Sequence, residues 1–192
     1  MIPRKYMMLL EHSGNGLVWL FAALTIWYLP IITPQQRCAI TNFLLAFVVD
    51  LILVGSLKSL IRRPRPIYNS SGDFILVVSV DQYSFPSGHA SRAFYVAAFA
   101  CVYFFHWSYL VCFVATVWAM VTALSRAAMG RHYVGDICAG MPIGILTVAF
   151  TTKGCFSLDS MLVDAQQAQR LYEIVNACFA WLRLSNGLTH LG

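Results

Sequence analysis

Three short clusters of polar residues interrupt a largely apolar chain of 192 residues. They are Lys58 with Arg65-Pro66, the tetrapeptide PSGH at 86–89, and Ser125-Arg126 with His132 and Asp136. Lysine and arginine supply positive charge, and the planar arginine fork matches the oxygens of a phosphate group. Proline and glycine at a helix start leave backbone amides that can bind an anion. Together the clusters favour a phosphate-binding site.

Two histidines in these clusters could perform the chemistry of phosphate-ester hydrolysis. His132 and Asp136 are four residues apart, so they share a face if the segment is helical. A carboxylate on one imidazole nitrogen fixes the tautomer and leaves the other nitrogen free to attack phosphorus. His89 is available as a general acid for the leaving alkoxide. Because the arginines can neutralise the phosphoryl charge, no metal or other cofactor is expected.

The spacing of the three clusters resembles the signature of the type 2 phosphatidic acid phosphatase superfamily, K-x6-RP, PSGH and SR-x5-H-x3-D, at every position. The resemblance implies an α-helical bundle and a metal-independent phosphatase that forms a phosphohistidine at His132. It also implies that Asp136 orients His132 and that His89 protonates the leaving group. The phosphate-binding residues that it implies are Lys58, Arg65, Ser87, Gly88 and Arg126.

Two longer stretches, SVDQYSFPSGHASRA (79–93) and LSRAAMGRHYVGD (124–136), resemble a narrower branch, the polyisoprenoid diphosphate phosphatases. That branch includes presqualene diphosphate phosphatase and implies farnesyl, geranylgeranyl and presqualene diphosphates as substrates, in the endoplasmic reticulum and nuclear envelope. Four further arginines exceed the need of one phosphate: Arg62, Arg63, Arg92 and Arg131. They could bind a second phosphate or a lipid headgroup, and the positive charge usual in membrane loops explains them equally well.

The composition indicates the elements that must position these residues. The chain is 59% hydrophobic and 11% charged, whereas soluble domains average about 25% charged residues. We therefore expect an integral membrane protein with an all-α fold, a polytopic helical bundle of about five spans. The predicted spans are 16–32, 41–57, 90–107, 108–125 and 133–152. One domain, 1–192, would hold a catalytic core at about 41–152.

The connecting and terminal segments lead to further expectations. Residues 2–12 interleave charged and apolar residues and are predicted to lie in the membrane interface. The TPQQR segment at 33–37 is predicted to form a turn, and 162–184 an amphipathic terminal helix. Asp50 interrupts the second span, and we expect it to point inward and support the pocket floor, because intramembrane acids face partners or polar cavities.

Two features of the sequence indicate opposite sides of the membrane for the opening of the site. Loop charges near the clusters favour a cytosolic site by the positive-inside tendency. A glycosylation sequon at Asn69, in the loop of the first two clusters, favours a lumenal site, as does the usual orientation of the family. The sequence decides for neither side.

The expected partners are a lipid phosphate substrate and membrane lipids, and no nucleic acid; the sequence indicates no oligomeric state. A second enzymatic hypothesis keeps the chemistry with phosphatidate or lysophosphatidate as substrate. A third is a non-enzymatic lipid-phosphate-binding membrane protein, which would be expected to lack His132 or His89. Six cysteines include no CxxC pair, so they predict no metal site.

Overall fold

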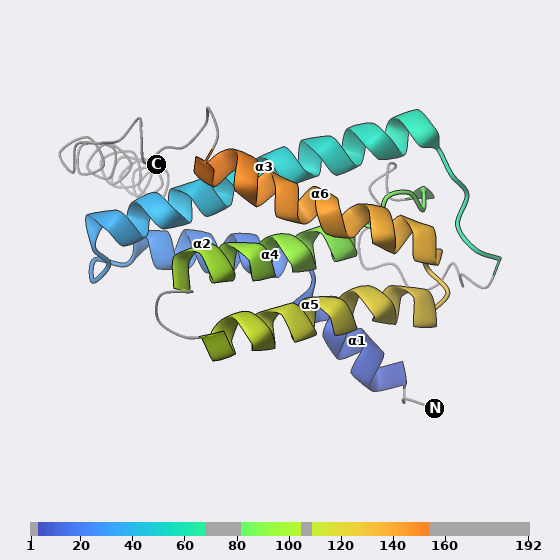
Figure 1. Ribbon diagram of the computed structural model, residues 1–192, viewed down its shortest axis with the longest axis horizontal. Helices are drawn as coiled ribbons and strands as arrows, with labels where there is room; N and C mark the ends of the chain where they lie inside the picture. The colour runs from blue at the N-terminus through green and yellow to red at the C-terminus, as the bar shows by residue number, and fades with distance from the viewer. Residues whose placement is uncertain (1–3, 68–81, 105–108, 154–192) are drawn as a thin grey trace, which may run out of the picture.

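The computed structural model describes residues 4–67, 82–104 and 109–153, and every regular element among them is an α-helix. The six helices are α1 (Arg4–Ser13), α2 (Gly16–Tyr28), α3 (Pro34–Ile61), α4 (Gly88–Phe104), α5 (Tyr109–Ala128) and α6 (Val134–Lys153). Helices α2 to α6 lie side by side along the long axis, and α1 packs against α5 (Figure 1). The predicted all-α bundle is confirmed. The expected terminal helix at 162–184 and the sequon at Asn69 lie outside the described residues.

Each of the five predicted spans coincides with one of the helices α2 to α6. Three of them, α3, α5 and α6, are long and apolar enough to cross a membrane by length and composition, whereas α2 is a shorter apolar helix of 13 residues. Helix α4 packs against both α5 and α6 and buries much of its length. Large apolar side chains on α5, including Phe113, Val114 and Leu124, face outward. Such an apolar exterior is typical of a lipid-facing surface, and the protein is an integral membrane protein.

Helix α3 begins earlier than the sequence predicted. It starts at Pro34 instead of Thr41, so the TPQQR segment is a helix start and not a separate turn. The Thr33 hydroxyl accepts a hydrogen bond from the Gln36 amide at 3.3 Å, and the Gln36 side chain accepts one from the Thr33 amide at 2.8 Å. This reciprocal cap satisfies two amides that the helix leaves unpaired, and it explains why the prediction was wrong.

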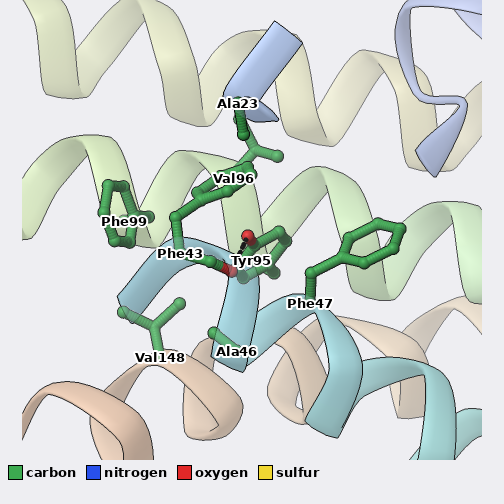
Figure 2. Close-up of a cluster of buried hydrophobic side chains, with 8 residues drawn as sticks. All are labelled: Ala23, Phe43, Ala46, Phe47, Tyr95, Val96, Phe99 and Val148. Carbon is green, nitrogen blue, oxygen red and sulfur yellow. Dashed lines mark hydrogen bonds between the residues drawn. The ribbon is translucent and has the colours of Figure 1, made fainter. Parts of the chain in front are cut away.

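A cluster of aromatic residues fixes α3 against α4 (Figure 2). The ring of Phe43 lies 4.8 Å from Tyr95 and 5.0 Å from Phe99, centroid to centroid. The Tyr95 hydroxyl donates a hydrogen bond of 2.7 Å to the Phe43 carbonyl, so its polar end is satisfied inside the cluster. This contact fixes the position of α3 relative to α4, and the ends of these two helices carry the first two clusters.

Glycines let α6 approach the backbone of α4. A side-chain carbon added at Gly144 would overlap the Ser91 carbonyl and lie 2.8 Å from the Tyr95 amide. One added at Gly140 would lie 2.6 Å from the Ser87 carbonyl. Small residues at helix contacts permit this close packing in membrane bundles. The second and third clusters are therefore held together by a backbone contact.

Replacing Gly144 with alanine should destabilise the bundle, because the added carbon must push α6 away from α4. We expect a loss of about 1–3 kcal/mol in the free energy of unfolding, measured as a lower thermal unfolding midpoint in detergent. Gly55→Ala is the matched control, since a side-chain carbon at Gly55 would meet no atom within 4 Å and alanine favours the helix. Equal shifts for the two variants would contradict the packing described here.

Candidate active site

The three polar clusters lie at one end of the bundle, where α3 ends, α4 begins and α5 connects to α6 (right side of Figure 1). Helix α3 extends to Ile61, so Lys58 lies in its last turn. Arg62 then adopts the left-handed conformation, with φ of 50°, and its amide donates to the Lys58 carbonyl at 3.0 Å. This C-cap turns the chain away from the helix and directs the Arg63–Pro66 segment toward the start of α4.

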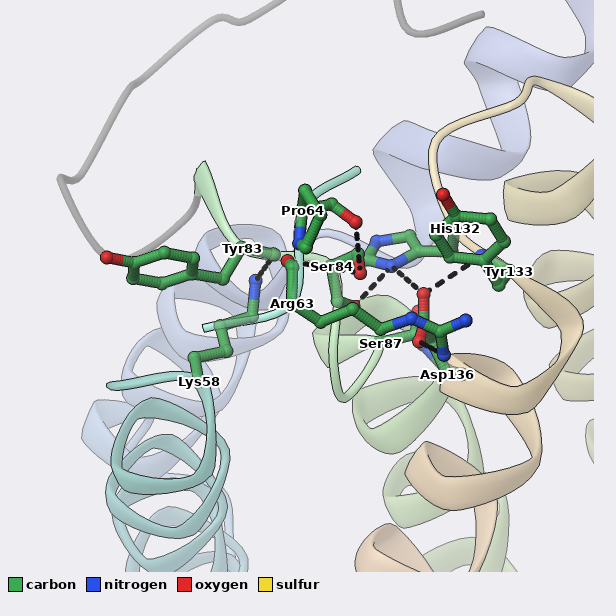
Figure 3. A network of polar contacts seen from close by, with 10 residues as sticks. Lys58, Arg63, Pro64, Tyr83, Ser84, Ser87, His132, Tyr133 and Asp136 are labelled. Atoms are coloured by element: carbon green, nitrogen blue, oxygen red, sulfur yellow. Dashed lines mark hydrogen bonds and ion pairs between the residues drawn. The ribbon is translucent and has the colours of Figure 1, made fainter. Parts of the chain in front are cut away.

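Three hydrogen bonds join the clusters pairwise (Figure 3). The Ser84 amide donates to the Arg63 carbonyl at 2.9 Å, and the Ser87 amide donates to the Asp136 carbonyl at 3.0 Å. The Arg63 guanidinium donates to Asp136 Oδ1 at 2.9 Å, which links the first cluster to the third. Segments far apart in the sequence thus form one site.

His132 is carried into this site by the turn between α5 and α6. Gly130 has a φ of 69°, a conformation that favours glycine. The Arg131 amide then donates to the Arg126 carbonyl at 3.0 Å, which reverses the chain and turns His132 inward. The His132 side chain is 3% exposed.

The tautomer of His132 follows from its neighbours. Its Nδ1 lies 2.8 Å from the Ser84 carbonyl oxygen. A carbonyl oxygen can only accept, so we assign the proton to Nδ1, which leaves the Nε2 lone pair free to act as a nucleophile. Asp136 Oδ2 lies 3.7 Å from Nδ1, beyond hydrogen-bond distance but within range of an ion pair.

The Asp136 carboxylate makes its shorter contacts elsewhere. In addition to the Arg63 guanidinium, it accepts the Tyr133 amide at 2.9 Å, which caps the start of α6. The Arg63 guanidinium also stacks over the Tyr133 ring, 4.1 Å from its centroid. The sequence predicts that Asp136 alone orients the His132 ring, whereas in the structure the Ser84 carbonyl also contacts the ring nitrogen. Sequence reasoning missed Ser84, because a backbone carbonyl carries no residue-specific signal.

Electrostatic surroundings keep His132 neutral. Burial is the largest cause of its lowered pKa, and the positive charges of Arg65, Arg126 and Lys58 lower the pKa further. The neighbouring Asp136 carboxylate acts in the opposite direction and does not overcome them. A neutral imidazole at pH 7 is the form that can attack phosphorus.

The predicted phosphate-binding cations surround this imidazole. The Lys58 ammonium is buried and donates to the Tyr83 carbonyl at 3.0 Å. Arg126 is 2% exposed, and its Nε and Nη1 donate no hydrogen bond within the described part of the chain. Buried guanidinium donors of this kind are expected to hydrogen-bond a ligand, since unpaired polar groups are costly inside a protein.

The PSGH segment leads into α4, which begins at Gly88. The Ser87 hydroxyl accepts a hydrogen bond of 3.4 Å from the Ala90 amide and so caps the helix. Gly88 lies where an added side-chain carbon would be 3.1 Å from an Arg92 guanidinium nitrogen, so the position is crowded. His89 follows in the first turn of α4, at the end of the bundle where α5 connects to α6. The structure therefore places the two predicted catalytic histidines at the same end of the bundle.

The four further arginines each contact the protein. Arg62 Nε donates to the Ser59 carbonyl at 2.8 Å, and Arg63 pairs with Asp136. Arg92 Nε lies 3.8 Å from Asp50 Oδ2, and Arg131 Nη1 lies 2.7 Å from Glu11 Oε1. Much of the charge that could meet a second phosphate is thus balanced by carboxylates of the same chain.

Asp50 is fully buried, and its partners lie on α4. Its Oδ1 accepts the Ser91 hydroxyl, and its Oδ2 is the ion-pair partner of Arg92. The contact with Arg92, beside Gly88, agrees with the expected inward orientation of Asp50. These contacts join α3 to the start of α4.

Glu11 on α1 contacts two arginines of the candidate site, and sequence reasoning missed it. Its carboxylate reaches Arg126 and Arg131 of the third cluster. The sequence predicts only an interfacial location for residues 2–12, and the acid beside the glycine-containing SGNG turn is the one signal of a contact with the site. The helix α1 thus contributes to the site as well as covering α5.

Comparison with known proteins agrees with this geometry. A sequence model described as the PAP2 superfamily matches residues 39–157. A probable lipid phosphate phosphatase beta of Arabidopsis thaliana is 40% identical over 149 residues, which cover 64% of this chain and 68% of that protein. Phosphatidylglycerophosphatase B of Bacillus subtilis is 36% identical over 124 residues, 58% of this chain and 55% of the relative.

A solved structure extends the similarity to the fold. The crystal structure of a transmembrane PAP2-type phosphatidylglycerolphosphate phosphatase from Bacillus subtilis superposes with a TM-score of 0.64 at 25% sequence identity. The alignment covers 82% of this chain and 77% of that one. The matched residues include all three clusters and the helices that hold them. The chain belongs to the PAP2 superfamily.

Proposed function

We propose that this protein hydrolyses phosphate esters of membrane lipids through a phosphohistidine at His132. The observation that carries the proposal is the contact of His132 Nδ1 with the Ser84 carbonyl at 2.8 Å. It leaves Nε2 unprotonated on a buried, neutral imidazole that is surrounded by cations. The names of the relatives, a lipid phosphate phosphatase and a phosphatidylglycerophosphatase, support the same reaction class.

The reaction would proceed in two balanced steps. In the first, His132 Nε2 attacks phosphorus, the P–O bond to the lipid alkoxide or lipid phosphate breaks, and the leaving oxygen can take a proton from the protonated form of His89. In the second, the now neutral His89 accepts a proton from a water molecule that attacks phosphorus. The P–N bond to His132 breaks, and inorganic phosphate leaves. Asp136 and the Ser84 carbonyl stabilise the orientation of the His132 ring and the charge that develops on it.

The positive side chains would stabilise the phosphoryl group as its charge increases. Lys58, Arg65 and Arg126 are the predicted cations, and the amides of Gly88 and the first turn of α4 add donors at a helix start. The Ser87 hydroxyl would add a donor while it accepts from the Ala90 amide. In the proposed reaction these charges would take the place of a metal ion.

Polyisoprenoid diphosphates are the first candidate substrates, on the resemblance of residues 79–93 and 124–136 to that branch. The same resemblance suggests the endoplasmic reticulum or nuclear envelope as the location. A lipid phosphomonoester such as phosphatidate or lysophosphatidate is the second candidate. It is favoured by the carboxylates that already pair with Arg63, Arg92 and Arg131.

Phosphate release from farnesyl diphosphate by the purified protein in detergent should be the same with and without a chelator, because the cationic side chains replace a metal. Phosphatidate added as a competitor decides between the two candidates, and a clear preference for it would reject the isoprenoid assignment. If no lipid phosphate is hydrolysed, a lipid-phosphate-binding role would replace the enzymatic one.

A further inference from the structure

The helix α1, which precedes the residues matched by the family, places an acidic side chain in the candidate active site. Glu11 Oε1 lies 2.7 Å from Arg131 Nη1 and 3.2 Å from Arg126 Nη1. The Glu11 side chain is 16% exposed and that of Arg131 is 9% exposed. One carboxylate oxygen therefore bridges two enclosed guanidinium groups of the segment that carries His132.

The position of Glu11 is set by the turn that follows it. The Ser13 carbonyl accepts a hydrogen bond of 2.7 Å from the Trp19 indole, and the Ser13 hydroxyl accepts one of 3.0 Å from Trp118 on α5. A side-chain carbon at Gly14 would lie 2.8 Å from a Thr122 methyl and 3.6 Å from the His89 ring. The turn is thus packed directly against α5 and against the predicted general acid.

The two arginines use Glu11 differently. Arg131 donates a hydrogen bond to the carboxylate. Arg126 is within ion-pair distance, but its Nε and Nη1 donate no hydrogen bond to any described residue. Arg126 therefore keeps its Nε donor for a phosphate, whereas Arg131 directs a donor to Glu11.

Arg131 is close enough to the reaction centre to affect a ligand there. It directly precedes His132, and one Glu11 oxygen joins its guanidinium to that of Arg126, a predicted phosphate-binding residue. Without the Glu11 carboxylate, the positive charge of this guanidinium would be less fully opposed beside the phosphate-binding residues. Removing one partner of an enclosed ion pair leaves the other charge uncompensated. A bound anion can then stabilise that charge.

We propose that Glu11 is a specificity-determining residue, which sets the preference of the site between one phosphate and two by engaging Arg131. This inference rests on the proposed function, since it concerns the substrate of the same site. A diphosphate carries more negative charge than a monophosphate on the same lipid. It therefore gains more from a released Arg131, and the Glu11 carboxylate opposes it more strongly.

The test compares kcat/KM for farnesyl diphosphate with kcat/KM for farnesyl monophosphate in the same detergent. Glu11→Gln, which preserves size and removes the charge, should raise the diphosphate-to-monophosphate ratio by about tenfold, the scale of one added hydrogen bond to a charged group. The double variant with Arg131→Gln should return the ratio to that of the wild type. Using a ratio cancels any change in the fraction of active protein.

His12→Gln is the matched control, because His12 is an exposed neighbour on α1 and should leave the ratio unchanged. An unchanged ratio in Glu11→Gln, or a raised ratio that persists in the double variant, would overturn the proposal. If Glu11→Gln does not fold, Arg131→Gln alone decides. An unchanged ratio then supports engagement of Arg131 by Glu11, and a lowered ratio shows that Arg131 already binds the second phosphate.

A measurement of anion binding tests the role of Glu11 independently of the proposed function. Calorimetric titration of the wild type and Glu11→Gln with inorganic phosphate and with inorganic pyrophosphate gives the same comparison without turnover. If the wild type hydrolyses neither lipid, the proposed function fails, and a rise in relative pyrophosphate affinity in Glu11→Gln still supports the role of Glu11. Unchanged relative affinity would reject that role whether or not the protein is an enzyme.

Discussion

Replacing His132 with alanine should reduce phosphate release by about 10⁴-fold or more, the scale seen when a covalent nucleophile is removed. Only direct attack by water, assisted by the surrounding cations, would remain. The measurement is phosphate release from farnesyl diphosphate in the presence of chelator, per folded protein in detergent, for the wild type and His132→Ala. Rapid acid quenching is avoided in favour of alkaline quenching, because an N-linked phosphoryl group is labile in acid.

The control for this prediction is His12→Ala, which removes an exposed imidazole outside the site and should retain activity. A radiolabelled phosphoryl group should be trapped on the wild type and on His12→Ala, and not on His132→Ala. If His132→Ala retains more than about one hundredth of the wild-type rate, a different group attacks phosphorus and the assigned nucleophile is wrong.

Replacing His89 with alanine should affect substrates according to their leaving groups. Loss of a general acid costs typically 10²–10⁴-fold, and we expect a loss in this range for an alkyl phosphomonoester, whose alkoxide needs a proton. The loss should be less than about tenfold for p-nitrophenyl phosphate, because nitrophenolate leaves without one. Initial rates for both substrates, at one pH and in one detergent, measure the difference.

The comparison between the two substrates is the control, because it distinguishes a catalytic role of His89 from a structural one. His89 packs near the Gly14 turn, so a general loosening of the site would reduce both rates together. Equal losses for the alkyl and aryl phosphates would therefore assign His89 to packing or ring placement. Normal release from both substrates would remove it from the mechanism.

Much of the candidate site could be predicted because its motifs are local. The spacing of Lys58 to Arg65 and of Arg126 to Asp136 is readable along the chain, and each motif begins or ends a helix. The all-α membrane fold was predictable for a related reason, since runs of apolar residues are long enough for helices in lipid. The start of α3 was mispredicted because Thr33, Pro34 and Gln36 have turn-like composition and act together as a cap.

The sequence by itself determined the class of the protein, the five apolar helices and the choice of candidate reacting residues, because composition and spacing are properties of the chain alone. Only the tertiary structure decided which neighbour contacts His132 Nδ1, which carboxylates pair with Arg63, Arg92 and Arg131, and that α1 supplies Glu11. Those partners are separated by 48 residues for His132 and Ser84 and by 120 residues for Arg131 and Glu11. Such pairs depend on how the helices pack and on where a backbone carbonyl points, and neither is encoded in any one segment of the chain.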